Sequence, residues 1–337
     1  MGRFLAGKNQ TSFQFESGTY GTVSGATQWP GEVQGFDPSD TENIQRIRYH
    51  GTNTRNLAKS VPGVKDYGFT FEQFPQHFKF LMLALGNCSD TTTGSPTYYS
   101  HVLTQLTSCE QSPVVSGPKC PFTSFSMESA QQCNPTGGNL NRLYNGCNVN
   151  SYTLAKTDNS APLVETVEVL AQSRTFSSGA PTFTSLTEIT RRPHAPFDSI
   201  LHFPSGTSMD AKTWEFNYGN NFDKDGSHVS NGSRNPNAAA ATETNITVSW
   251  AMDGDSAHAA RLFGLFENGG LSQENVAIQV NNYGNSASGM AWITVSGCDV
   301  EMTAPNPTEG VDEWSISLTG QVADAIVQDS IIKYLPW

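Results

Sequence analysis

The segment Asn145-Gly146-Cys147-Asn148-Val149 decides how this chain is to be interpreted, because Ser296-Gly297-Cys298-Asp299-Val300 repeats its pattern. The two cysteines lie 298 − 147 = 151 residues apart. Each copy is followed by a polar gap and then by a run of alternating apolar and polar residues, at 163–169 and at 314–320. Alternation of this kind predicts half-buried β-strands.

A second pair of similar segments lies upstream of the first pair. Phe69-Thr70-Phe71-Glu72 precedes an apolar stretch that predicts a short helix at 75–86, with Gly86 placed to cap it. Ile246-Thr247-Val248-Ser249-Trp250 precedes a similar stretch at 256–267. Four elements in the same order indicate an internal duplication.

The duplication divides the chain into two domains of ordinary size. We expect a first domain at 1–171, a linker at 172–196 and a second domain at 197–337. The helices are further apart than the Gly-Cys segments, so the first domain should carry an insertion at about 88–138. Its composition is rich in Gly, Pro and Cys, and we expect an outward-facing decoration that assembly does not need.

Composition favours an all-β fold with a few short helices. Only 15% of the 337 residues are charged, and turn-forming residues are plentiful. The net charge is −12, and Arg191-Arg192 is the largest basic cluster, which argues against a surface that grips nucleic acid. This acidity suits an ordinary soluble surface, and equally a wall past which nucleic acid slides without sticking.

The six cysteines form no Cys-x-x-Cys pair and have no histidine at zinc-finger spacing. One or two disulfides within 88–147 remain open, whereas Cys147 and Cys298 are expected to be small buried residues of the core. The nucleophile, phosphate-loop and metalloprotease motifs are also missing. We therefore expect no enzyme, and assign no catalytic residue, no cofactor-binding residue, no cofactor and no metal.

Membrane insertion and export by a signal peptide are not expected. No apolar run reaches about 18 residues, and residues 1–10 become polar too early for a signal peptide. The sequence therefore predicts synthesis in the cytoplasm and no membrane partner.

The order of these segments resembles that of tail tube proteins of tailed viruses, in the group whose subunit has two tandem tube domains. The first copy of the pattern comprises a strand at 44–49, a long polar loop at 50–66, a strand at 67–71, the helix at 75–86 and the Gly146 strand. The second copy comprises strands at 214–218 and 245–250, the helix at 256–267 and the Gly297 strand.

The resemblance implies two tandem β-sandwich or half-barrel domains, each with one flanking helix. It implies a structural virion protein, the major tail tube subunit, made in the host cytoplasm and located in the virion tail. Because each chain would supply two tube domains, homotrimeric rings are expected to stack into a tube for genome delivery. The implied partners are further copies of the chain, the tape-measure protein and viral DNA in the channel, and other tail proteins at the tube ends.

The loop at 50–66 carries Arg55, Lys59 and Lys65 in an otherwise acidic chain. We interpret these residues as candidates for contact with carboxylates of the adjacent ring, the alternative being a solvated loop.

Three other functions stay open at this point. The tube of a related bacterial or archaeal injection device has the same implied fold. A secreted or cell-surface β-sandwich that binds carbohydrate would use Trp and Tyr side chains. A glycoside hydrolase would need two carboxylates that can lie far apart in the sequence.

Overall fold

The computed structural model describes residues 3–16, 20–22, 27–47, 59–93, 98–106, 124–134, 140–178, 193–204, 206–223, 240–253, 274–281, 290–302 and 313–329. Within these ranges the chain is almost entirely antiparallel β-structure, with one helix, α1 (Lys79–Leu85), and one short 3-10 turn, η1 (Pro196–Asp198). The prediction of an all-β fold with few and short helices is confirmed.

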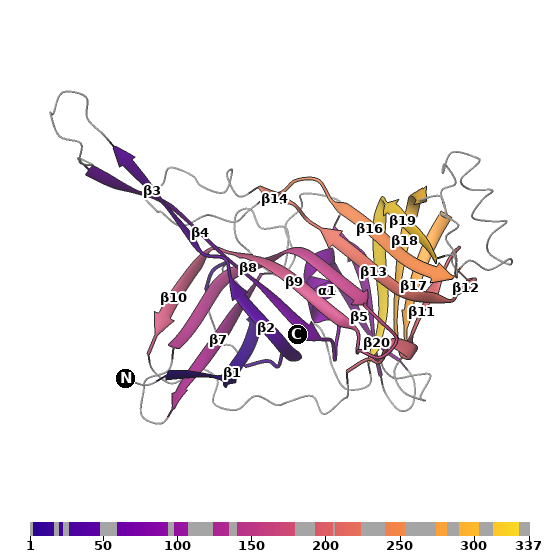
Figure 1. Ribbon diagram of the computed structural model, residues 1–337, viewed down its shortest axis with the longest axis horizontal. Helices are drawn as coiled ribbons and strands as arrows, with labels where there is room; N and C mark the ends of the chain where they lie inside the picture. The colour runs from indigo at the N-terminus through magenta and orange to yellow at the C-terminus, as the bar shows by residue number, and fades with distance from the viewer. Residues whose placement is uncertain are drawn as a thin grey trace.

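The strands of the first half are β1 (Arg3–Phe15), β2 (Glu32–Pro38), β3 (Thr41–Ile47), β4 (Lys59–Phe74), β5 (Gly86–Thr93), β6 (Tyr98–Gln105), β7 (Phe125–Asn134), β8 (Leu140–Lys156), β9 (Val164–Ala171) and β10 (Ser173–Ser177). The strands of the second half are β11 (Ser199–His202), β12 (Ser208–Met209), β13 (Ala211–Gly219), β14 (Phe222–Asp223), β15 (Ala240–Ala241), β16 (Asn245–Asp253), β17 (Glu274–Val280), β18 (Met290–Met302), β19 (Glu313–Gly320) and β20 (Val322–Asp329). Figure 1 shows the two halves side by side.

The same set of strand pairings occurs in both halves. In the first half β2 pairs with β4, β4 with β9 and β9 with β8, while β8 also pairs with β7 and β10, and β7 pairs with β1. In the second half β13 pairs with β16, β16 with β19 and β19 with β18, while β18 also pairs with β17 and β20, and β17 pairs with β11. Each half is thus a sandwich whose two sheets share one long strand.

A left-handed glycine lets that long strand serve both sheets. Gly146 in β8 has φ of 62° and Gly297 in β18 has φ of 68°. Residues before each glycine pair with β10 or β20, and residues after it pair with β9 or β19. The two Gly-Cys segments therefore occupy the same place in each half, and Cys147 and Cys298 are buried as predicted.

One large hydrophobic core runs through both halves and includes α1. All seven residues of α1 are buried, and Gly86 caps the helix in the left-handed conformation, as predicted. Asn220 of the second half reaches across to it, since its Nδ2 donates to the carbonyls of Ala84 at 3.0 Å and Val149 at 2.9 Å. The helix therefore helps to join the halves.

A buried carboxylate fixes the end of β1 to the bend in β8. Glu16 accepts hydrogen bonds from the backbone N–H of Gly146 at 2.7 Å and of Gly21 at 2.8 Å. It also accepts hydrogen bonds from the hydroxyls of Ser124 at 2.7 Å and Ser126 at 2.8 Å. These bonds supply the partners that a buried carboxylate requires.

The prediction of a loop over 50–66 is wrong for residues 59–66. These residues belong to β4 and pair with β3, for example Lys65 with Glu42 and Lys59 with Ile47. The resulting two-stranded ribbon projects from the body in Figure 1. The ribbon has no core side, and residues 59–66 lack the apolar alternation by which strands are recognised. The strand predicted at 44–49 does alternate, and it is confirmed over residues 44–47 as part of β3. Residues 48–58, with Arg55, lie outside the described residues.

Two other boundaries also need correction. Within the expected insertion at 88–138, β7 is an integral strand between β1 and β8, and β5 and β6 form a hairpin that pairs with β20. Within the expected linker at 172–196, β10 pairs with β8 and belongs to the first half. The helix expected at 75–86 begins only at Lys79, and the one expected at 256–267 lies outside the described residues.

Alanine at the two bend glycines should destabilise the fold unequally. A Cβ on Gly146 would meet Cβ of Gln172 at 2.7 Å, whereas a Cβ on Gly297 would meet only the side chain of Gln321 at 3.2 Å or more. We expect Gly297→Ala to lower the free energy of unfolding by about 1–2 kcal/mol through backbone strain, and Gly146→Ala by roughly 1–2 kcal/mol more through the clash. Gly35→Ala, with open space around its Cβ, is the control. Urea unfolding measures the free energy of unfolding of all three variants. An equal loss of stability in Gly146→Ala and Gly297→Ala would contradict this account.

Candidate assembly surface

One continuous sheet of eight strands crosses both halves. Its order is β2-β4-β9-β8-β13-β16-β19-β18, because β8 of the first half pairs with β13 of the second. The joint runs from Ser151 opposite Gly219 to Lys156 opposite Trp214. Beyond its end, the N–H of Asn220 donates to the carbonyl of Asn150 at 2.8 Å. The two halves therefore form one continuous hydrogen-bonded sheet within a single chain.

The two faces of this sheet differ in chemistry because side chains alternate along each strand. The core face carries large apolar residues such as Phe71, Tyr152 and Tyr218. The opposite face carries a row of paired positions that crosses all eight strands, namely Gly35, Glu72, Thr166, Thr153, Asn217, Thr247, Thr319 and Asp299. Hydroxyl, amide and carboxylate groups make up this row, which contains no lysine or arginine.

A neighbouring row on the same face is polar in the second half, where Glu215 pairs with Ser249 and Ser249 with Ser317. In the first half the same row continues with the apolar residues Ala155 and Val164. We call these two rows the polar face. The alternation predicted these strands, but which of their faces would be uncovered depends on long-range pairing that the sequence alone did not reveal.

The two ends of the eight-stranded sheet are open edges within the described residues. At one end β2 pairs with β4 alone, and at the other end residues 299–302 of β18 pair with β19 alone. Open edges present unpaired backbone N–H and C=O groups, which another chain can pair with.

The ribbon of β3 and β4 presents apolar side chains to solvent. Ile44 is 54% exposed and Val61 is 43% exposed. Lys59 and Lys65, two of the predicted contact residues, lie on the β4 strand of this ribbon, whereas the third, Arg55, is outside the described residues. The structure therefore places two of the three residues on one projecting element.

A cluster of metal-ligating residues that the sequence search missed lies on the β5–β6 hairpin. Cys88, Asp90 and His101 bring one ligand atom each to within 4.8 Å of one another. Asp90 lies directly opposite His101 in the hairpin. The search for regular spacing along the chain could not find ligands that two strands contribute.

Buried Glu165 is a titratable group on the core face of the eight-stranded sheet. Its side chain is 0% exposed, and burial raises its pKa from 4.5 to about 7, although hydrogen bonds with Gln73 and Tyr152 oppose this shift. Gln73 Nε2 donates directly to Glu165 Oε2. The protonated form of Glu165 therefore predominates in the folded chain below about pH 7.

Comparison with known protein families finds no match, and comparison with curated proteins finds no match either. Among the described residues, no helix has the length and apolar character that a membrane span requires.

Replacing Glu165 with glutamine should alter how stability depends on pH. Because the folded pKa is raised, Glu165 contributes its full stability below about pH 4.5, and this contribution is lost as pH rises through about 7. We expect the difference in free energy of unfolding between Glu165→Gln and the parent chain to shift in favour of the variant by up to roughly 3 kcal/mol from pH 4.5 to pH 8. Glu215→Gln is the control, since its side chain is exposed. A difference that does not change with pH would refute the role assigned to Glu165.

Proposed function

We propose that this chain is a structural subunit that assembles into rings and tubes, as the tail tube proteins of tailed viruses do. The observation that carries the proposal is the joint between β8 and β13. It shows how one half pairs edge to edge with the other, and the same two kinds of edge are open at the ends of the sheet.

The equivalence of the edges follows from the strand register. Val169 pairs with Val149 and Phe69 in the first half, and Leu318 pairs with Val300 and Val248 in the second. By this register, β18 in the second half is equivalent to β8 in the first half, and β2 in the first half is equivalent to β13 in the second. A second chain can therefore add its β2 to the free edge of β18 as β13 adds to β8.

Such a contact is head-to-tail, so it produces a ring if the rotation closes. Each chain supplies two four-stranded units, and a ring of six units needs three chains. The assembly would have true three-fold and approximate six-fold symmetry. Stacked rings would then form a tube.

The polar face supports this proposal because it has the chemistry that a channel for DNA requires. Phosphates are repelled by carboxylates and have no ammonium or guanidinium group to bind along these two rows. We therefore assign the polar face to the inner wall of the tube. The net charge of −12 is in keeping with that assignment.

Cysteine cross-linking tests the contact between chains at a defined position. Glu301 is the equivalent of Ser151, because Glu301 pairs with Ser317 of β19 and Ser151 pairs with Glu168 of β9. Thr41 is the equivalent of Gly219, because Thr41 pairs with Asp66 of β4 and Gly219 pairs with Asn245 of β16. Because Ser151 and Gly219 face each other within one chain, Glu301 of one chain should face Thr41 of the next.

The chain with Glu301→Cys and Thr41→Cys should give covalent trimers on a non-reducing gel after oxidation. The pair Ser151→Cys and Gly219→Cys is the matched control and should cross-link only within a chain. Image averages of the assembled rings should show three chains. Rings of six chains would refute the duplicated-sheet arrangement, and a protein that stays monomeric at high concentration would favour a carbohydrate-binding module.

The ribbon of β3 and β4 should be needed for stacking rings rather than for forming them. Ile44→Ser with Val61→Ser removes exposed apolar side chains, so folding and ring formation should persist while tubes become shorter. Phe197→Ser, which alters an apolar side chain that is 73% exposed on η1, is the control. Tube length is measured by electron microscopy. An unchanged tube length in the double variant would show that the ribbon is solvated and does not contact the adjacent ring.

A further inference from the structure

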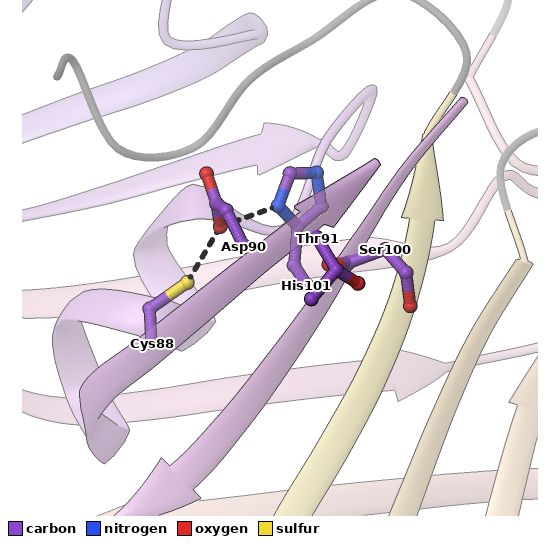
Figure 2. A network of polar contacts seen from close by, with 5 residues as sticks. All are labelled: Cys88, Asp90, Thr91, Ser100 and His101. Carbon is purple, nitrogen blue, oxygen red and sulfur yellow. Dashed lines mark hydrogen bonds and ion pairs between the residues drawn. The ribbon is translucent and has the colours of Figure 1, made fainter. Parts of the chain in front are cut away.

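The β5–β6 hairpin gathers three side chains of different chemistry on one face. Cys88 and Asp90 are two residues apart on β5, so they point to the same side of the strand, and His101 lies opposite Asp90 on β6. Figure 2 shows the carboxylate of Asp90 between the thiol and the imidazole.

The contacts within this cluster are short. Cys88 Sγ donates to Asp90 Oδ1 at 3.1 Å, and His101 Nδ1 lies 2.8 Å from the same oxygen. The imidazole is completely buried, whereas the side chain of Asp90 is 10% exposed and Cys88 is half-buried. A small cation can therefore approach from the side of Asp90 and Cys88 while the buried ring holds a fixed position.

The arrangement does not suit a cysteine nucleophile. A thiol is activated where nearby positive charge stabilises the thiolate, but the carboxylate beside Cys88 is negatively charged and disfavours the thiolate. Burial raises the pKa of the Cys88 thiol well above its usual value, and Asp90 raises it further. A bound divalent cation would reverse this effect, because it replaces the thiol proton and neutralises the carboxylate.

We propose that Cys88, Asp90 and His101 form a zinc site. Sulfur, imidazole nitrogen and carboxylate oxygen are the three ligand types that zinc accepts, and three protein ligands leave a fourth position for water. Magnesium and calcium prefer oxygen ligands alone, so the thiolate and imidazole discriminate against them.

The position of the site indicates what the metal does. His101 pairs on its other side with Val327 of β20, so the hairpin links the first half to a strand of the second. Zinc bound to residues of both β5 and β6 would tie this hairpin together where it meets β20. Bound zinc would therefore stabilise the hairpin through three protein ligands, in contrast to the closed four-ligand shell of most structural zinc sites, and this role is independent of the proposed tube function.

Metal titration of the full chain tests the site. After removal of metal with a chelator, the chain should bind one equivalent of zinc in competition with a chromophoric chelator. Cobalt(II) in its place should give a thiolate-to-metal charge-transfer band. Zinc should also raise the melting temperature and slow amide hydrogen exchange in β5 and β6.

Removal of a ligand should weaken binding by roughly a hundredfold or more, since loss of outer partners alone costs 10- to 100-fold. Cys88→Ser should abolish the charge-transfer band, and His101→Gln and Asp90→Asn should each lose the zinc-dependent rise in melting temperature. Cys298→Ala, which removes a buried free thiol elsewhere, should bind as the parent chain does.

Two results would overturn the assignment. One is no saturable binding of zinc by the parent chain at micromolar concentrations, which would leave the cluster as a hydrogen-bonded network. The other is a cobalt band that persists in Cys88→Ser, which would place the metal on other cysteines. Should Cys88→Ser fail to fold, the same titration of Asp90→Asn decides between the site and the network.

Discussion

The rest of the structure depends on the backbone pairing of β8 with β13. It joins two four-stranded units into one sheet and places Asn220 where it can bond to the carbonyls of Ala84 and Val149. This pairing uses the edges that two separate four-stranded sheets would expose, and among the described residues it leaves β2 and β18 as the open edges of the eight-stranded sheet. Under the proposed function, the complementarity of these two edges between chains would follow from how the chain folds internally.

The bend glycines make this arrangement possible. A strand confined to one sheet could not pair with β10 before the bend and with β9 after it, as β8 does around Gly146. A residue with a Cβ would be strained at such a φ, and at Gly146 it would also clash with Gln172. The Gly-Cys motif combines this bend with a small residue that packs in the core directly after it, and both halves use the same solution.

The sequence predicted those parts of the fold whose pattern is local. Alternation located β9, β13, β16 and β19, and the repeated Gly-Cys motif located the equivalent strands β8 and β18, but not the bend that each makes at its glycine. Of the ribbon, the strand predicted at 44–49 overlaps β3, but residues 59–66 of β4 escaped detection because an uncovered strand needs no apolar alternation. The Cys88, Asp90 and His101 cluster escaped because its members meet only through the register of a hairpin. The polar face could be assigned only once the eight strands were in order.

The difference between the halves lies away from the shared sheet. The β5–β6 hairpin pairs with β20 in the second half, whereas β10, which holds the same place in the first half, pairs only with β8 among the described residues. Under the proposed function, the inner wall of a ring would consist of six similar four-stranded units, while the hairpin would occur only three times around it. Approximate six-fold symmetry should therefore hold at the channel and give way to three-fold symmetry further out, since among the described residues only the first half of each chain carries the hairpin.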